Sequence, residues 1–269
     1  MAIENLKYWD SVSATWWKLD DQALWRHHSD AVNLTLLARW LPKARVDCLL
    51  KTDVFDEAFG EGLYPMLESK AKHVVNMDIS ISTLKQARVR YPELQSVKAD
   101  VRCLPYADRA FDIVVSNSTL DHFTSRDQIV ESLRELSRTL APNGQLLLTM
   151  DNLANPAVWL RNALPFRWLH RLGLLPYYVG VTCGPRRLRR YLKQAGFDVL
   201  ETTAILHCPR VMAVALARYL NGRVDRRTQR SFLRFILGFE RLERWPTRYL
   251  TGYFVAVRAA KRRSQTPSP

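Results

Sequence analysis

The sequence is poor in cysteine and contains no long, uncharged apolar run. Its four cysteines, Cys48, Cys103, Cys183 and Cys208, are far apart and form no C-x-x-C pair. This spacing indicates neither a zinc site nor a disulfide framework, so no metal is implied and we expect reduced thiols. No apolar run reaches the roughly 18 residues that a membrane-spanning helix needs. The first five residues lack the basic and apolar regions of a signal peptide, which favours a cytoplasmic protein.

Glycine is also scarce, with 10 residues in 269, and no Gly/Ser-rich linker is present. The chain is long enough to bury a full core and suits one elaborated domain, or one domain with a cap. We therefore expect a globular protein throughout, apart from a disordered tail after residue 263.

Acidic residues are rare in the second part of the chain. Residues 1–150 contain 18 Lys and Arg against 20 Asp and Glu, whereas residues 151–269 contain 22 against 6. The net charge of +14 is therefore concentrated in the carboxyl-terminal part. This asymmetry favours an anionic partner, whether nucleic acid, a membrane surface or an acidic substrate. A soluble, arginine-rich surface is the alternative.

Residues 46–78 predict a strand–helix–strand unit. Residues 46–50 and 73–78 are short apolar-biased runs, and residues 63–72 between them are compatible with a helix. Gly60 and Gly62 precede this helix, so backbone without a side chain could approach a ligand there. Asp78 ends the second strand, where an acid typically binds a ribose diol.

The rest of the first 150 residues alternates between strands and helices. Ser80 predicts the start of a helix over 81–91. Further strands are expected at 97–100, 111–117 and 145–150, with a helix over 126–140 and a turn at 142–144. This alternation predicts a parallel sheet covered on both faces.

Tryptophan-rich and arginine-rich segments flank this core. Residues 1–42 predict two amphipathic helices, in which Trp16 and Trp17 either pack on the domain or form a lid over an apolar substrate. Residues 43–152 form the expected core. Residues 153–269 complete the sheet and contribute two insertions, 153–185 and 208–248, that are expected to form a helical cap.

Four segments resemble, in order and spacing, successive motifs of class I S-adenosylmethionine-dependent methyltransferases of the small-molecule type. They are 78–80 (Asp-Ile-Ser), 99–106, 111–123 and 140–144. The resemblance covers about residues 40–150, with weaker similarity over 188–199 and 252–259. It implies an α/β, doubly wound, mostly parallel sheet of seven strands. It also implies S-adenosylmethionine as cofactor and S-adenosylhomocysteine as product.

The resemblance also implies roles for individual residues. Asp78 would bind the ribose hydroxyls and Ile79 would cover one face of the adenine. Asp100 and the amide of Val101 would bind the adenine edge, and Asn117 at the end of the fourth strand is a further candidate contact. These roles suit the side chains, because carboxylates accept hydrogen bonds from hydroxyl and amine groups.

One departure from the family concerns its first glycine-rich motif. Ten residues, 50–59, intervene between the first strand and Gly60-x-Gly62. Either this acidic loop wraps the methionine end, with Asp53, Asp56 or Glu61 binding its ammonium, or cofactor binding has been lost. The missing tight Gly-x-Gly-x-x-Gly turn also argues against NAD-dependent oxidoreduction.

The residues at the end of the fourth strand and the composition of the two insertions indicate the class of methyl acceptor. Residues 116–119 lack the Asn/Asp-Pro-Pro-aromatic motif of base methyltransferases, and many aliphatic residues accompany the arginines. Both features argue against nucleic acid and favour a small or lipid-like hydrophobic acceptor, with an anionic membrane as a candidate second partner. His122 is the candidate general base, with a structural Asp-His pair as the alternative, and His207 is weaker. A binding or scaffolding protein without catalysis is the competing interpretation.

Overall fold

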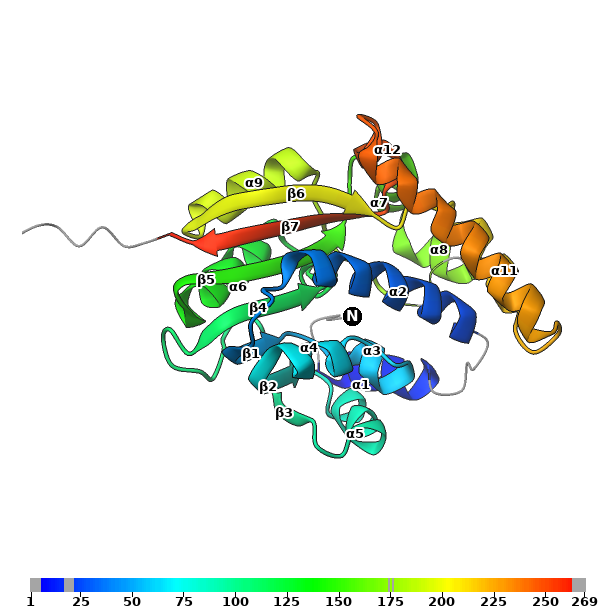
Figure 1. Ribbon diagram of the computed structural model, residues 1–269. Coiled ribbons are helices and arrows are strands. Elements are labelled where there is room, and N and C mark those ends of the chain that lie inside the picture. Colours follow the sequence, from blue (N-terminus) through cyan, green and yellow to red (C-terminus); the bar gives the residue numbers. More distant parts are fainter. Residues whose placement is uncertain (1–5, 17–21, 174, 176, 263–269) are drawn as a thin grey trace, which may run out of the picture.

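A seven-stranded sheet in the order β3-β2-β1-β4-β5-β7-β6 forms the centre of the molecule (Figure 1). The computed structural model describes residues 6–16, 22–173, 175 and 177–262. β7 is antiparallel to both of its neighbours, and the other pairs are parallel. The strands are β1 (Val46–Lys51), β2 (Ala71–Asp78), β3 (Gln95–Lys98), β4 (Phe111–Asn117), β5 (Leu140–Asp151), β6 (Phe197–Ile205) and β7 (Phe254–Lys261). The expected α/β fold with a mostly parallel sheet is confirmed.

The helices cover both faces of this sheet and one of its ends. Those before and within the core are α1 (Leu6–Trp16), α2 (Ala23–Trp40), α3 (Phe55–Phe59), α4 (Tyr64–Lys70), α5 (Ile81–Arg90), η2 (Leu120–His122) and α6 (Arg126–Thr139). Those that follow are α7 (Pro156–Ala163), α8 (Phe166–Arg171), α9 (Pro185–Gln194), α10 (Arg210–Leu220), α11 (Arg226–Leu237), η3 (Gly238–Arg244) and α12 (Arg248–Thr251).

Two hydrophobic cores lie on opposite faces of the sheet, because successive residues of a strand point to opposite sides. In β1, Leu49 belongs to the core under α2 and α4, whereas Leu50 belongs to the core under α6 and α9. β4 divides in the same way, with Val115 on the first face and Val114 on the second. This two-sided burial explains why the strands read as continuous apolar runs.

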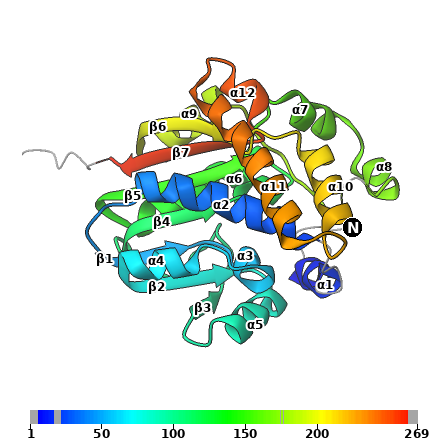
Figure 2. The same cartoon turned by 45° about the vertical axis from the view of Figure 1, so that its right-hand side comes forward.

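The two insertions form helices beyond the carboxyl ends of the parallel strands. Figure 2 shows α8, α10 and α11 at the same end of the molecule, with α1 below α10. α10 and α11 also contact α2, which ties this cap to the first core. None of the helices in the described ranges has the length and apolar character needed to cross a membrane.

The element boundaries differ from the expected ones around the first loop. Residues 55–59, expected as loop, form α3, in which the rings of Phe55 and Phe59 contact each other at 4.8 Å between centroids with their planes tilted by 52°. The helix expected over 63–72 ends at Lys70, so β2 begins two residues early. β3 ends at Lys98 and leaves Asp100 in the following loop, paired by a single bridge to Cys103.

A buried lysine organises the loop after β1. The Lys51 side chain is fully buried, and its Nζ donates to Glu57 Oε2 at 2.8 Å and to the Asp53 carbonyl at 2.6 Å. Glu57 Oε1 in turn accepts from the backbone N–H groups of Leu63 and Tyr64 at 2.8 and 3.1 Å, where α4 begins. Lys51 therefore links β1 to α3 and α4, and the nearby carboxylates hold the pKa of its ammonium above the ordinary value although burial opposes this.

We expect Lys51→Met to destabilise the fold by about 3–5 kcal/mol, because it leaves the Glu57 carboxylate buried without its cation. Lys72→Met is the control, since the Lys72–Asp47 pair at 2.6 Å is exposed and little change should follow. Urea unfolding of both variants measures the difference. Equal stability of Lys51→Met and the wild type would contradict a structural role for this ion pair.

Candidate cofactor and acceptor site

A cavity of about 850 Å³ lies at the carboxyl ends of the parallel strands, under the cap. Its sheet end is lined by residues that follow β1, β2, β3 and β4, among them Asp53, Asp78, Asp100 and Asn117. Its other end is lined by α1, α2, α7, α8 and α10. The volume is near the upper end of the range for ligand sites, as expected for a cavity that accommodates more than one group.

Asp78 lies where β2 ends and joins the loops on either side of the cavity. Its Oδ2 accepts from the Val54 N–H at 3.1 Å, and its Oδ1 accepts from the Ser80 N–H at 2.8 Å. Burial raises the pKa of Asp78 to about 7, although these hydrogen bonds favour the charged form. Each oxygen retains a second lone pair, so the carboxylate can still accept from two hydroxyl groups.

Ser80 starts α5 and fixes α1 beside the cavity. Its Oγ accepts from the Thr83 N–H and donates to Asp10 Oδ1 at 2.6 Å. The same Asp10 oxygen accepts from the Ser82 N–H at 3.1 Å. Trp9, one residue earlier on α1, consequently lines the cavity.

Asp100, Val101 and Ile79 form an apolar slot with one charged edge. Arg102 binds the Asp100 carboxylate through both Nε and Nη2, at 3.0 and 2.6 Å, and lies over the Phe123 ring. Burial acts to raise the pKa of Asp100, but these bonds outweigh it and hold the pKa below its ordinary value. Asp100 is therefore a carboxylate that shares its acceptor capacity between Arg102 and any ligand amine.

Acidic side chains surround the loop after β1. Asp53 accepts from Thr119 Oγ1 at 3.2 Å, and Asp56 accepts from Asn117 Nδ2 at 3.2 Å. Burial, followed by the nearby Asp30 carboxylate, raises the pKa of Asp56. Asp53 and Asp56 both line the cavity. Asp53 and Asp56 are therefore the carboxylates of this corner that can accept from a ligand ammonium.

Gly60, Glu61 and Gly62 lie behind the loop that faces the cavity. None of the three lines the cavity, because α3 carries the chain away from it. The Gly62 N–H donates to Asp30 Oδ2 at 3.2 Å, and a Cβ on Gly62 would lie 2.7 Å from the Glu57 carboxyl group. Glu61 is exposed. These glycines serve close packing behind the loop, and Thr52 and Asp53 face the cavity in their place.

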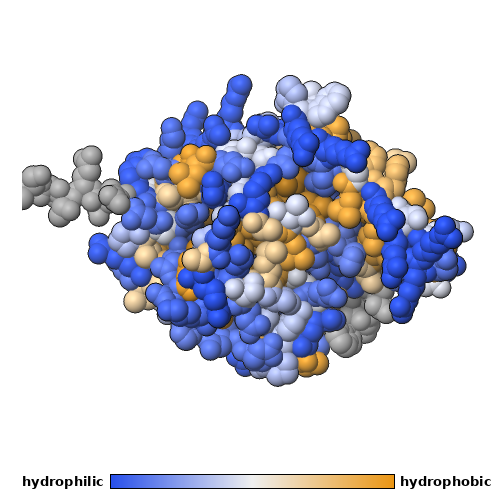
Figure 3. All heavy atoms as spheres, in the orientation of Figure 1, coloured by the Kyte–Doolittle hydropathy of each residue, from blue (hydrophilic) through white to orange (hydrophobic). Residues whose placement is uncertain are grey.

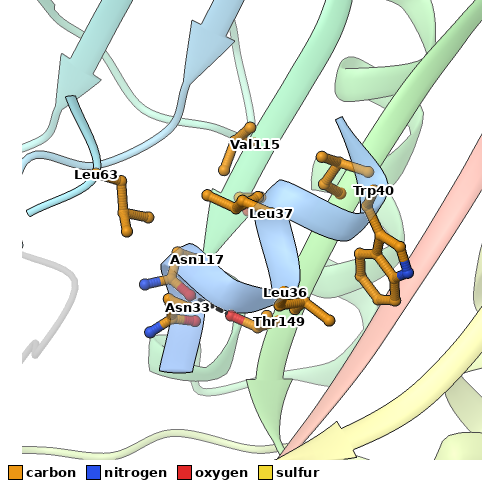
Figure 4. A pocket seen from close by; sticks show the side chains of 10 residues that line it. Asn33, Leu36, Leu37, Trp40, Leu63, Val115, Asn117 and Thr149 are labelled. Carbon is orange, nitrogen blue, oxygen red and sulfur yellow. Dashed lines mark hydrogen bonds between the residues drawn. The ribbon is translucent and has the colours of Figure 1, made fainter. Parts of the chain in front are cut away.

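Asn117 is held in one orientation by the sheet. Its Oδ1 accepts from Thr149 Oγ1 on β5, as the dashed line in Figure 4 shows, which directs its Nδ2 towards Asp56. The space drawn in Figure 4, between α2 and the sheet, measures about 10 Å³ and has room for one water molecule at most. It is a packing gap beside Asn117, distinct from the ligand cavity.

His122 lies on the cavity wall between two aromatic rings. Its ring centroid is 4.9 Å from that of Trp9 and 5.9 Å from that of Tyr177. His122 Nε2 is 3.8 Å from Asp121 Oδ1, and His122 Nδ1 has no hydrogen-bond partner among the described residues. The lid expected from Trp16 and Trp17 falls on side chains outside those that the structure describes.

His207 does not line the cavity, which removes it as a catalytic candidate. Its two ring nitrogens are 2.7 Å from Thr251 Oγ1 and 2.9 Å from the Ala204 carbonyl. Burial lowers its pKa. His207 therefore stabilises the chain around the end of β6 as a neutral imidazole.

A buried arginine pair at the cap end was not identified from the sequence. Arg161 on α7 binds Asp151 Oδ2 at 2.8 Å and donates to the Tyr253 hydroxyl at 2.8 Å. Arg210, at the start of α10, lies with its guanidinium carbon 4.3 Å from the Tyr253 ring centroid. Asp151 ends β5 in the same way as Asp78 ends β2, so the acid at the end of a strand is a sequence signal that could have identified Asp151. No local pattern marks Arg161 or Arg210.

Comparisons with known proteins agree with this arrangement. Residues 56–148 match the family model described as Methyltransferase domain. A Mycolicibacterium smegmatis protein named probable S-adenosylmethionine-dependent methyltransferase is 26% identical over 156 residues, which are 58% of this chain and 55% of that protein. A Mus musculus protein named probable tRNA methyltransferase 9B is 30% identical over 95 residues, 35% of this chain and 21% of that protein. The chain thus covers only about half, or less, of the length of these relatives.

The fold has counterparts among solved structures. A chain from the complex between the Haloferax volcanii Trm112 methyltransferase activator and its candidate methyltransferase superposes with a TM-score of 0.62. The superposition covers 94% of this chain and 99% of that chain, at 17% identity, so it concerns the fold.

Residues 56–148 match a methyltransferase domain and the fold is shared with a candidate methyltransferase, so this chain resembles class I S-adenosylmethionine-dependent methyltransferases. The methyl donor of this class is S-adenosylmethionine. The cavity fits that group by its own chemistry, because a buried carboxylate with spare acceptor capacity, apolar side chains and further carboxylates line it.

We expect Asp78→Asn to weaken S-adenosylhomocysteine binding by about 1.5–3 kcal/mol, since hydrogen bonds to a charged acceptor are lost. Hydroxyl donors stabilise the charged carboxylate, so binding should lower the Asp78 pKa from about 7 and release a proton. Wild-type affinity should therefore increase as the pH rises through 7, and part of this dependence should be absent in the variant.

Calorimetric titration at pH 6 and pH 8 measures both effects. Asp198→Asn, which changes an exposed acid on β6 that pairs with Arg262, is the matched control. An Asp78→Asn protein with the affinity and the pH profile of the wild type would remove Asp78 from the cofactor site.

Proposed function

We propose that this chain transfers the methyl group of S-adenosylmethionine to a small or lipid-like hydrophobic acceptor held under the helical cap. The observation that carries the proposal is the continuity of one cavity from the acidic sheet end to the apolar cap end. That cap end is lined by Leu160 of α7, Leu164 directly after α7, Leu169 of α8 and Val214 of α10. Donor and acceptor would then meet in a space that the cap separates from bulk water.

In this proposal each end of the methyl donor has a partner in the chain. Asp78 accepts from the ribose hydroxyls, Ile79 and Val101 cover the adenine, and Asp100 receives the adenine amine. Asp53 and Asp56 bind the ammonium, with Asn117 positioning Asp56. The sulfonium supplies an activated methyl group and a good leaving group, so the protein contributes orientation and exclusion of water.

His122 is the side chain proposed to take a proton from the acceptor. It lines the cavity, and the Trp9 and Tyr177 rings restrict its orientation. Asp121 is buried, and burial together with Asp151 raises its pKa. Asp121 would stabilise the imidazolium that forms when His122 accepts the proton.

Binding of S-adenosylhomocysteine to the purified protein tests the cofactor half of the proposal. At a ligand concentration 100 times the Kd, the native state should gain about 2.7 kcal/mol and the melting temperature should rise. A protein that shows neither calorimetric heat nor a thermal shift at millimolar ligand would be a scaffold without methyl transfer.

Asp53→Asn should weaken S-adenosylmethionine and S-adenosylhomocysteine alike, because both carry the ammonium group. Adenosine lacks that group, so its binding should barely change. The three ligands are compared by titration in the variant and in the wild type. An equal loss for adenosine would mean that Asp53 acts through Lys51, 3.6 Å from its carboxylate, and has no contact with the ammonium.

His122→Gln should slow the single-turnover rate of methyl transfer by about 10²–10⁴-fold and leave S-adenosylmethionine affinity unchanged, if His122 is the base. Equal single-turnover rates would restrict His122 to packing between Trp9 and Tyr177.

A membrane surface is the proposed route to a lipid-like acceptor. Large apolar side chains on the cap helices are more than half exposed, namely Trp159, Trp168, Leu172, Met212 and Tyr219. Exposed arginines accompany them at Arg167, Arg171 and Arg223. Figure 3 shows hydrophobic and strongly hydrophilic groups side by side where α8 and α11 lie. This combination suits the interface of an anionic bilayer.

The protein should co-sediment with anionic phosphatidylglycerol vesicles more than with neutral phosphatidylcholine vesicles, and salt should weaken the binding. Trp168→Ala should reduce it, whereas Leu200→Ala should not, because Leu200 is 52% exposed on β6, outside the cap. A parallel titration with tRNA tests the alternative that the acceptor is tRNA, which the name of the Mus musculus relative suggests. Tight tRNA binding without vesicle binding would exclude the lipid route.

A further inference from the structure

Arg210 presents a cation to the cavity without a carboxylate beside it. Its guanidinium carbon is 4.3 Å from the ring centroid of Tyr253 and 5.7 Å from those of Trp25 and Phe254. The side chain lines the cavity. Across the described parts of the chain, Arg210 forms no hydrogen bond and no ion pair.

The neighbouring Arg161 differs in this respect. Arg161 pairs with Asp151 at 2.8 Å, and it also donates to Tyr253 and Asn162. Asp151 pairs directly with Arg161 and attracts Arg210 only at longer range, so one carboxylate faces two guanidinium groups. Charges removed from water are normally paired, so this arrangement needs a partner. The three aromatic rings attract the cation but accept none of its N–H groups in a strong hydrogen bond.

We propose that Arg210 binds an anionic group, a carboxylate or a phosphate, carried by the methyl acceptor. The inference rests on the proposed function and defines its acceptor further. A guanidinium offers a planar fork of donors that matches either anion in a bidentate manner. The Tyr253 hydroxyl accepts from Arg161 Nη1, so its own proton remains available as a further donor to the same anion.

The charges at the two ends of the cavity would orient this acceptor. Asp53, Asp56 and Asp78 line the sheet end, where Arg102 is paired with Asp100, whereas Arg161, Arg210 and Arg218 outnumber Asp151 at the cap end, so the cap end attracts an anion. Leu164, Leu169 and Val214 provide an apolar wall at the cap end of the same cavity. An amphiphile with one anionic group would therefore bind in one direction, with its anionic group at the cap end and away from Asp53, Asp56 and Asp78.

Titration of dodecanoate, dodecyl phosphate and dodecanol into the intact protein tests the proposal. The three probes share one apolar chain, so their difference measures the contribution of the anion. Each titration is made with and without S-adenosylhomocysteine, below the micelle concentration of the probe. The variants are Arg210→Met, which keeps the length and removes the charge, and Arg210→Lys. Arg262→Met is the matched control, because Arg262 is exposed and pairs with Asp198, away from the cavity and the cap.

We expect the wild type and Arg262→Met to bind at least one anion 10- to 100-fold more tightly than dodecanol. Arg210→Met should lose this preference with unchanged dodecanol affinity, and Arg210→Lys should retain part of it. The melting temperature of Arg210→Met should not fall, because no partner loses its counter-charge. Arg161→Met should melt lower, since it leaves Asp151 unpaired.

Two results would overturn the proposal. One is equal anion affinity in Arg210→Met and the wild type, and the other is a wild type that binds neither anion better than dodecanol. A wild type that does not bind S-adenosylhomocysteine would instead contradict the proposed function. The titrations made without that ligand would still measure the anion preference, so the two outcomes can be told apart.

Discussion

The buried contact between Lys51 and Glu57 is the interaction on which the rest of the site depends. In a parallel sheet the strand ends gather at one edge, and here they bring several carboxylates together. Lys51 supplies a cation inside that group and connects the end of β1 to the start of α4 through Glu57. Without it, Asp53 and Asp56 would face Asp78 with no compensating charge, and the loop after β1 would lose its connection to α4.

The same contact explains the departure from the family's first glycine motif. A loop rich in glycine lets backbone approach the ligand directly. In this chain α3 fills that position, and side-chain carboxylates face the cavity where glycines would otherwise lie. The methionine end of the cofactor would therefore be recognised by charge more than by backbone, which makes the electrostatics of this corner important for affinity.

Much of the sheet could be predicted from the sequence because its signals are local. Asp78, the Ser80 cap and the apolar run at 111–117 each lie within one short segment, and short apolar runs identify the strands. α3 could not be predicted, because a five-residue helix is stabilised by the packing of Phe55 on Phe59 and not by its own sequence pattern. The positions of Gly60 and Gly62 could not be predicted either, because α3 precedes them and leads the chain away from the cavity. The cluster of Trp25, Arg210 and Tyr253 joins three distant parts of the chain, so no spacing rule could reveal it.

The central proposal is that a methyl donor and an amphiphilic acceptor lie together in one cavity, with the donor at the sheet end and the acceptor at the cap end. Transfer of radiolabelled methyl groups from S-adenosylmethionine to fractionated cell material tests this most directly. Lipid extract, total RNA and soluble protein from the source cells would be supplied separately to the enzyme. The account predicts label in an anionic, solvent-extractable product of the lipid fraction. Label that appears in RNA alone would contradict it.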